Sequence, residues 1–110
     1  MTTPFVAGLR SRHATIRLTP EGVHAITIRV EMPEVWDVVR IVVAPTEPVL
    51  AAKVAALQAL YPEADAELHA DFVVKLRGWE ILDEAASLTD AGAIDGSILL
   101  LTFRRRRAVR

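Results

Sequence analysis

The stretch HAITIRVEMPEVWDVVRIVVAPTEPVLAAKVAALQALYP, residues 24–62, decides the fold of this chain. Apolar side chains occupy every second position near its start, as in a half-buried strand: Ile26, Ile28, Val30 and Met32. The segment VVRIVVA, residues 38–44, predicts a second strand with three apolar residues on one face: Val39, Ile41 and Val43. Only the short segment PEVWD separates the two strands, so the pair predicts a hairpin.

The second half of the stretch predicts one helix that ends at Pro62. Thr46 is placed to cap this helix, and Pro48 lies in the first turn, where its missing N–H costs little. The alanine, leucine, glutamine and lysine residues that follow have good helix propensity. Apolar residues recur along one face, as in a helix that lies on a sheet: Leu50, Val54, Leu57 and Tyr61.

The rest of the chain predicts three further strands. DFVVKLRG, residues 71–78, has an inward set of side chains: Phe72, Val74 and Leu76. Its outward set is Val73, Lys75 and Arg77. WEIL (79–82) predicts a short strand, DEAASLTDAGAIDG (83–96) a loop, and SILLLTF (97–103) a last strand with three inward residues: Leu99, Leu101 and Phe103. The order β-β-α-β-β-β predicts an α+β fold in which a mixed sheet packs on one helix.

Length and composition predict a single domain with one modest core, since the chain has 110 residues and 52% of them are apolar. Residues 1–24 form an N-terminal arm in which the alternating segment ATIRL fits a short extra edge strand. Residues 25–104 form the domain, and residues 105–110 form a basic C-terminal tail. No apolar stretch is long enough to span a membrane or to act as a signal peptide, so we expect a cytoplasmic protein.

Charge is distributed unevenly along the chain. Residues 25–103 carry five basic and thirteen acidic side chains, a net charge of −8, whereas residues 104–110 carry five arginines and no acidic residue. The tail could be solvated, lie on its own acidic body, or bind a protein partner. Nucleic acid and anionic lipid are the least favoured partners of the tail, because the acidic domain repels polyanions and no aromatic residue among the arginines could stack on a base.

Three segments resemble a known family. VRIVVAPTEPVLAAKVAAL is similar to the strand-to-helix segment of the ubiquitin-like β-grasp proteins, and KLRGWEILDEAASL is similar to their strand-Gly-strand-Asp-loop-Leu segment. The third segment, SLTDAGAIDGSILLL, is especially similar to the YukD-type ubiquitin-like proteins associated with bacterial type VII secretion. Its matching residues are Leu88, Asp90, Gly92, Asp95, Gly96, Leu99 and Leu101. We expect structural roles for them, with Gly92 and Gly96 at positive φ and Leu88 closing the end of the sheet.

The resemblance also shows two departures that bear on function. Conjugated ubiquitin-like modifiers end in Gly-Gly, whereas the segment RRRRAVR has arginines and no glycine. The binding patch of ubiquitin combines an isoleucine on the third strand with a histidine and a valine on the last strand. The matching positions here are Lys75, Leu100 and Thr102. A lysine at the centre of the patch argues against the usual contacts with ubiquitin receptors.

No catalytic constellation is evident, so we expect a protein that is not an enzyme and needs no cofactor or metal. His69 lies beside Glu67 and Asp71, but no further ligands are spaced to complete a four-coordinate metal site. Trp36, in the hairpin turn, and Trp79, just past the third strand, are candidates for partner contact, since tryptophan is enriched at interfaces. The alternative is that each tryptophan covers an edge of the core.

These observations predict a non-catalytic ubiquitin-like protein-interaction module, an accessory or adaptor protein of a bacterial assembly such as type VII secretion. The alternative is a ubiquitin-like modifier of a bacterial conjugation pathway with an atypical tail. The partner would be a secretion component in the first case and an activating or conjugating enzyme in the second. The candidate partner-binding residues are Trp36, Lys75, Arg77, Trp79, Leu100, Thr102, Arg104, Arg105, Arg106 and Arg107.

Overall fold

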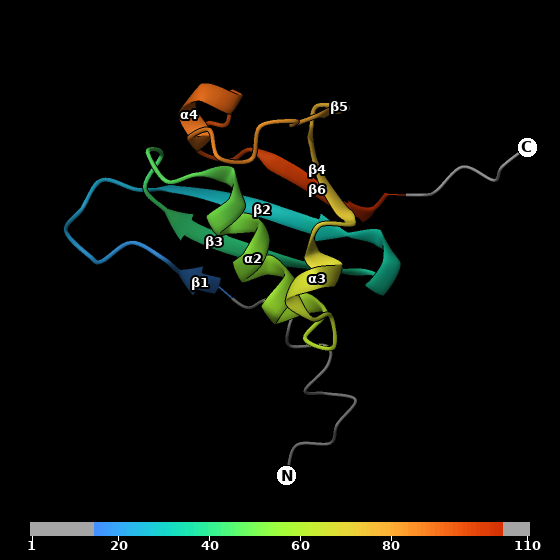
Figure 1. Ribbon diagram of the computed structural model, residues 1–110. Helices are drawn as coiled ribbons and strands as arrows, with labels where there is room; N and C mark the ends of the chain where they lie inside the picture. Colours follow the sequence, from blue (N-terminus) through green and yellow to red (C-terminus); the bar gives the residue numbers. More distant parts are fainter. Residues whose placement is uncertain (1–14, 105–110) are drawn as a thin grey trace, which may run out of the picture.

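The computed structural model describes residues 15–104, which form a six-stranded sheet with one long helix on one of its faces (Figure 1). In chain order the strands are β1 (Thr15–Arg17), β2 (Ile26–Met32), β3 (Asp37–Val43), β4 (Phe72–Leu76), β5 (Trp79–Glu80) and β6 (Ile98–Phe103). Their order across the sheet is β1-β3-β2-β6-β4-β5. The β1–β3 and β2–β6 pairs are parallel and the other pairs are antiparallel, so the predicted mixed sheet is confirmed.

The predicted hairpin consists of β2 and β3, joined by the 3-10 helix η2 (Pro33–Val35). The alternating segment ATIRL forms β1, which pairs with the outer edge of β3 through the register Ile16↔Ile41. The Leu18 amide extends this pairing by donating to the Val42 carbonyl at 2.8 Å. Because β1 occupies this edge, part of the β3 backbone is not available for pairing with another chain.

Helix α2 (Val49–Leu60) begins later than the sequence predicts, and the cap predicted at Thr46 is wrong. Pro48 occupies the N-cap position and no side chain caps the helix. Backbone carbonyls of a distant loop take the first amides instead: Val49 N–H donates to the Ala86 carbonyl at 2.9 Å, and Leu50 N–H donates to the Glu84 carbonyl at 2.8 Å. The loop before the last strand therefore replaces a side-chain cap.

The buried face of α2 also differs from the predicted stripe. Leu57 is buried as predicted, but Leu50 is exposed, and Val54 and Tyr61 are half-buried. The buried residues of the helix are Val49, Ala52, Lys53, Ala56, Leu57 and Leu60. Two of them are alanines and one is a lysine, so the side chains that meet the sheet do not stand out as an apolar stripe in the sequence.

Two short helices occur in segments for which the sequence predicts a connection and a loop. Helix α3 (Ala66–His69) is capped by Asp65, whose carboxylate accepts from the Leu68 amide. Helix α4 (Leu88–Ala91) interrupts the loop predicted at 83–96, and the Ser87 hydroxyl oxygen caps it by accepting from the Asp90 amide. Gly92 ends α4 at a φ of 99°, which confirms the predicted positive φ there.

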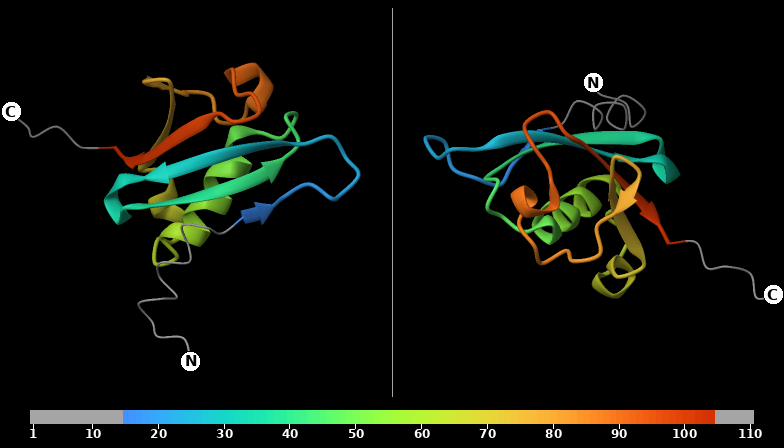
Figure 2. Two further views of the ribbon diagram at one scale, coloured as in Figure 1. Left: turned by 180° about the vertical axis from the view of Figure 1, so that it is seen from behind. Right: turned by 90° about the horizontal axis from the view of Figure 1, so that it is seen from above.

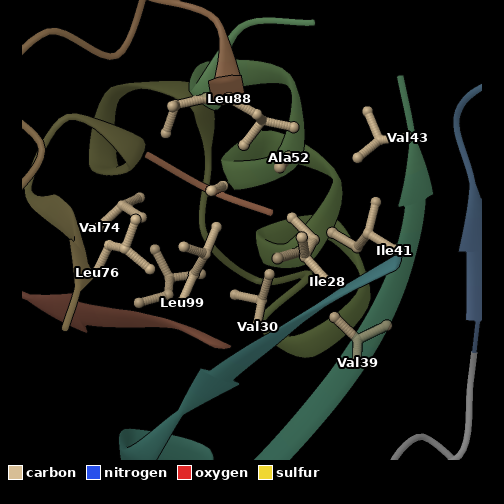
Figure 3. Packing of buried hydrophobic residues seen from close by; sticks show 14 of the residues in the cluster. Ile28, Val30, Val39, Ile41, Val43, Ala52, Val74, Leu76, Leu88 and Leu99 are labelled. Carbon is tan, nitrogen blue, oxygen red and sulfur yellow. The ribbon is translucent and has the colours of Figure 1, made fainter. Parts of the chain in front are cut away.

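The core lies between α2 and the inner face of the sheet (Figure 3). The inward residues predicted for the β2–β3 hairpin are all buried, and so are those of β4. Leu88 is fully buried, as predicted, and Leu99 and Leu101 of β6 are buried. Phe103 shares their side but is 43% exposed, and its ring packs edge-on against Phe72. Among residues 15–104, no helix is long and apolar enough to cross a membrane.

A charged pair lies at the edge of this core. The Lys53 ammonium on α2 is 3.0 and 3.1 Å from the two carboxylate oxygens of Glu84, in the loop that also caps the helix. The Lys53 side chain is 3% exposed and that of Glu84 is 23% exposed. A lysine this buried needs its partner, because an unpaired charge away from water is costly.

We predict that removing Glu84 destabilises the domain more than removing Lys53 does. Glu84→Ala leaves the buried Lys53 ammonium unpaired and lowers the free energy of unfolding by about 3–5 kcal/mol. Lys53→Met keeps most of the packing and leaves a carboxylate that can still reach water, so the loss is about 1–2 kcal/mol. Urea unfolding of both variants measures the two losses, and an equal or reversed order would contradict the assignment of Lys53 as the buried member.

Candidate functional site

The candidate site is the face of the sheet opposite α2. Figure 2 shows α2 on one side of the sheet, and no described element covers the other side. The strand registers place outward side chains in rows that cross the sheet. One row is Val38, Glu31, Leu100, Lys75 and Glu80. A second row is Arg40, Arg29 and Ile98. We call this surface the outer face.

The outer face is basic although the domain is acidic. Its basic residues are Arg17, Arg29, Arg40, Lys75 and Arg104. Its acidic residues on the strands are Glu31 and Glu80, and two more lie at its border: Glu34, bonded to Thr102, and Asp37, in the hollow beside Arg29. The other acidic residues between positions 25 and 103 lie in loops, turns and helices. Basic and acidic residues therefore lie on different surfaces of the domain. The net charge of −8 does not show this, because a sum along the chain does not record which side of a strand each residue faces.

Several of these cations have no counter-ion among the residues that the structure describes. Nη2 of Arg29 lies 3.6 Å from Oε2 of Glu31, and both side chains are a little under half exposed. No described residue forms an ion pair with Arg40 or Lys75. Arg40 is exposed and Lys75 is half-buried. An accessible cation without a close anion remains available to an acidic partner, and such charges mainly set the association rate and the specificity.

Trp36 lies at the border of the outer face. It follows η2 and adopts a φ of 55°, a left-handed conformation that is rare for a bulky residue. Its side chain is 88% exposed, so it does not cover the edge of the core. Together with Arg29, Glu31 and Val38 it lines a shallow hollow of about 320 Å³. An exposed aromatic side chain beside a basic, partly apolar face is typical of a binding surface.

The structure places the three positions that match the ubiquitin patch on neighbouring strands. Lys75 lies directly opposite Leu100, and Thr102 lies opposite Val73. The Thr102 hydroxyl donates to Oε2 of Glu34 at 2.7 Å, and the Phe103 amide donates to the same oxygen at 2.7 Å. Thr102 therefore helps to fix η2 against β6. This role could not be predicted from the sequence, because Glu34 is far from Thr102 along the chain.

Arg104 continues the line of β6. Its amide donates to the Asp71 carbonyl at 2.6 Å, and its Nη2 lies 2.8 Å from Oε2 of Glu80. This ion pair crosses β4, on the side where Val73 lies. Val73 was predicted to face outward and does so by register, but it is only 4% exposed. The predicted contact residues Arg105, Arg106 and Arg107 lie outside the described residues.

Arg77 and Trp79 lie apart from the outer face. Arg77 has a φ of 53°, which ends the strand alternation, and its Nη2 is 3.5 Å from where a Cβ on Gly92 would lie. Trp79 pairs with the inward-facing Leu76, so it does not share the side of Lys75. It is 79% exposed at the end of the sheet opposite to Trp36. The structure therefore does not bring the two tryptophans into one site.

Within residues 15–104, no group of three or more histidine or acidic side chains is arranged to hold a metal ion. The chemistry that the outer face can offer is hydrogen bonding and ion pairing by guanidinium and ammonium groups around the apolar side chain of Leu100.

Solved structures with similar folds include a ubiquitin-like domain of an Arabidopsis thaliana protein, with 18% identity and a TM-score of 0.59 over 84% of this chain and 93% of that chain. The ubiquitin of Caldiarchaeum subterraneum has 17% identity and a TM-score of 0.61 over 76% of this chain and 98% of that one. The C-terminal ubiquitin-like domain of mouse tubulin-specific chaperone e has 11% identity and a TM-score of 0.62, over 84% and 99% respectively.

These structures establish the fold: the chain is an α+β protein with the ubiquitin-like β-grasp. Identities of 11–18% carry no information about activity or partner. No protein-family model matches the chain, and no curated protein matches it by sequence.

We predict that the left-handed conformation of Trp36 lowers the stability of the domain. Trp36→Gly removes an exposed side chain and relaxes a left-handed residue, so the free energy of unfolding rises by about 1 kcal/mol. Trp36→Ala keeps the unfavourable conformation and gains nothing. Chemical denaturation of the two variants and the unaltered protein tests this. A Gly variant no more stable than the Ala variant would mean that the left-handed conformation carries no cost, and a loss of stability in both variants would mean that the indole packs on the domain.

Proposed function

We propose that this chain is a non-catalytic ubiquitin-like interaction module that docks an acidic surface of a larger assembly on its outer face. The observation that supports this most strongly is a basic face that no element between residues 15 and 104 covers, on an otherwise acidic domain, with Leu100 near its centre and Trp36 at its border. A partner with carboxylates around an apolar side chain would complement this arrangement.

A protein partner fits the outer face better than a nucleic acid does. A carboxylate, Glu31, lies among the cations and next to Leu100, and it would repel a phosphate backbone. Only one tryptophan borders the face, whereas sheets that bind single-stranded nucleic acid carry several aromatic side chains for base stacking.

The finer assignment is to an accessory or adaptor protein of a bacterial assembly, similar to the YukD-type proteins of type VII secretion. It is supported by the pattern Leu88, Asp90, Gly92, Asp95 and Gly96. These residues shape the chain before β6: Leu88 is buried, Gly92 ends α4, and the Asp95 carboxylate accepts from the Thr27 amide at 2.8 Å. The pattern therefore bears on the kind of ubiquitin-like protein and not on the residues that contact a partner.

The second candidate function is that of a covalent modifier in a bacterial conjugation pathway. The overall likeness to ubiquitin and the arginines after β6 favour it, while the absence of glycine from residues 97–110 argues against threading through narrow enzyme channels. Incubation with a cognate activating enzyme and ATP should then yield an adduct at the C-terminal carboxylate. Mass spectrometry that finds only unmodified protein would exclude this alternative.

The test of the proposed function compares two charge reversals two residues apart. Lys75→Glu inverts a cation of the outer face, whereas Arg77→Glu inverts one that lies beside Gly92. We expect Lys75→Glu, but not Arg77→Glu, to weaken binding of the captured partner about tenfold or more. Affinity capture from extracts of the source cells, followed by titration of the enriched partner, measures this.

Both variants should unfold at the same denaturant concentration as the unaltered protein, which separates a binding defect from misfolding. Arg40→Glu provides a second reversal on the outer face, at a distance from Lys75. Equal partner binding by the unaltered protein, Lys75→Glu and Arg40→Glu would overturn the assignment of the outer face.

A further inference from the structure

A second surface, away from the outer face, is an apolar groove at the end of the domain where α2 stops. Its lining is Met32, Glu34, Val35, Tyr61, Leu68, Phe72 and Phe103. The groove has a volume of about 550 Å³, within the range of pockets that hold a ligand or a peptide side chain. Six of the seven lining residues are apolar or aromatic, and we call this surface the apolar groove.

The groove lies where the segment after α2 meets the ends of β2, β4 and β6. Helix α2 ends at Leu60, and Tyr61 and Leu68 of α3 line the groove together with Phe72 of β4 and Phe103 of β6. Three aromatic rings form its walls: the Tyr61 and Phe72 centroids are 6.0 Å apart, and those of Phe72 and Phe103 are 5.2 Å apart. Both contacts are edge-on, which leaves ring edges and faces for a further apolar side chain.

Acidic side chains border one side of the apolar groove. A neighbouring hollow of about 440 Å³ shares Leu68 with the groove, and its other lining residues are Glu63, Asp65, Glu67 and Asp71. Asp65 caps α3 with one carboxylate oxygen. No described residue forms an ion pair with Glu63, Glu67 or Asp71, so these carboxylates are not neutralised within residues 15–104. We call these four residues the acidic rim.

We propose that the apolar groove and the acidic rim form a second docking site, for a peptide segment of a partner protein that carries an apolar or aromatic anchor flanked by lysine or arginine. The groove would take the anchor, and the rim would pair with the flanking cations. Charge complementarity favours a peptide with basic flanking residues, because an acidic peptide would be repelled by the four carboxylates of the acidic rim. The site is opposite in charge to the outer face, so one domain can hold an acidic and a basic partner at once.

Calorimetric titration of the full chain with blocked synthetic peptides tests the proposal. The probe is Arg-Arg-Leu-Phe-Arg-Arg, and the control peptide is Arg-Arg-Ser-Ser-Arg-Arg, which keeps the charge and lacks the anchor. We expect the probe to bind at least about fivefold more tightly than the control, because only the probe can fill the groove. Equal affinity of the two peptides would overturn the docking site.

Matched variants locate the binding. Glu63→Gln with Glu67→Gln removes two exposed rim charges, and Glu21→Gln with Glu47→Gln removes two exposed charges elsewhere. We expect the rim pair, and not the control pair, to weaken binding of the probe about fivefold at low salt. Leu68→Asp should abolish binding, and the rim pair keeps the test valid if that variant does not fold. No difference between the two pairs would overturn the proposal.

Two other possible occupants of the apolar groove, the chain's own C-terminal residues and a second copy of the chain, can be distinguished by experiment. Affinity that rises when Arg105, Arg106 and Arg107 are changed to glutamine would mean that the chain's own residues fill the groove, and it would overturn the assignment to a partner. Sedimentation showing a dimer that the rim pair dissociates would identify a second copy as the occupant, and it would overturn the assignment equally.

Discussion

The contact between α2 and the loop before α4 is the interaction on which the rest of the structure depends. The loop takes the first two amides of the helix through the carbonyls of Ala86 and Glu84, and the Glu84 carboxylate holds the buried ammonium of Lys53. The same contacts bring Leu88 into the core. A helix with no side-chain cap and two buried alanines depends on these tertiary contacts for its position, since helices of this length are marginal alone.

The position of α2 also determines which surfaces remain for function. One helix covers only the inner face of the sheet, and no other described element covers the outer face, which carries five of the seven basic residues between positions 15 and 104. The apolar groove lies at the end of α2, where Tyr61 meets Phe72 and Phe103. Both candidate surfaces therefore follow from a two-layer domain with a single helix, and neither requires a catalytic group.

Much of the fold could be predicted from local patterns. Alternation is strict in β2, and Arg40 marks the outward side of β3, so the buried sets Ile26 to Met32 and Val39 to Val43 were predicted correctly. The helix stripe was wrong because alanine and lysine carry little apolar signal, and because the start of α2 is set by a loop some 35 residues away. The short helices α3 and α4 were missed although Asp65 and Ser87 are ordinary capping residues, since four-residue helices give no periodicity.

The candidate site was predictable only in part. The resemblance matched Lys75 and Leu100 to one binding patch, and the two residues lie directly opposite each other on β4 and β6. The basic character of the outer face was missed because net charge sums over both faces of each strand. Glu34 and the acidic rim were missed for a different reason: their neighbours are set by the ends of strands and helices, which sequence patterns locate least well.

The most direct test of the central claim is an amide chemical-shift titration of the full chain, with Arg105, Arg106 and Arg107 changed to glutamine, against the blocked peptide Glu-Glu-Leu-Phe-Glu-Glu. The account predicts that the shifts concentrate on the central outer-face residues Arg29, Arg40, Lys75 and Leu100, and that the amides of α3 do not move. Shifts centred on Leu68 and Phe103, or spread evenly over the domain, would contradict the claim that the outer face is the surface that binds an acidic partner.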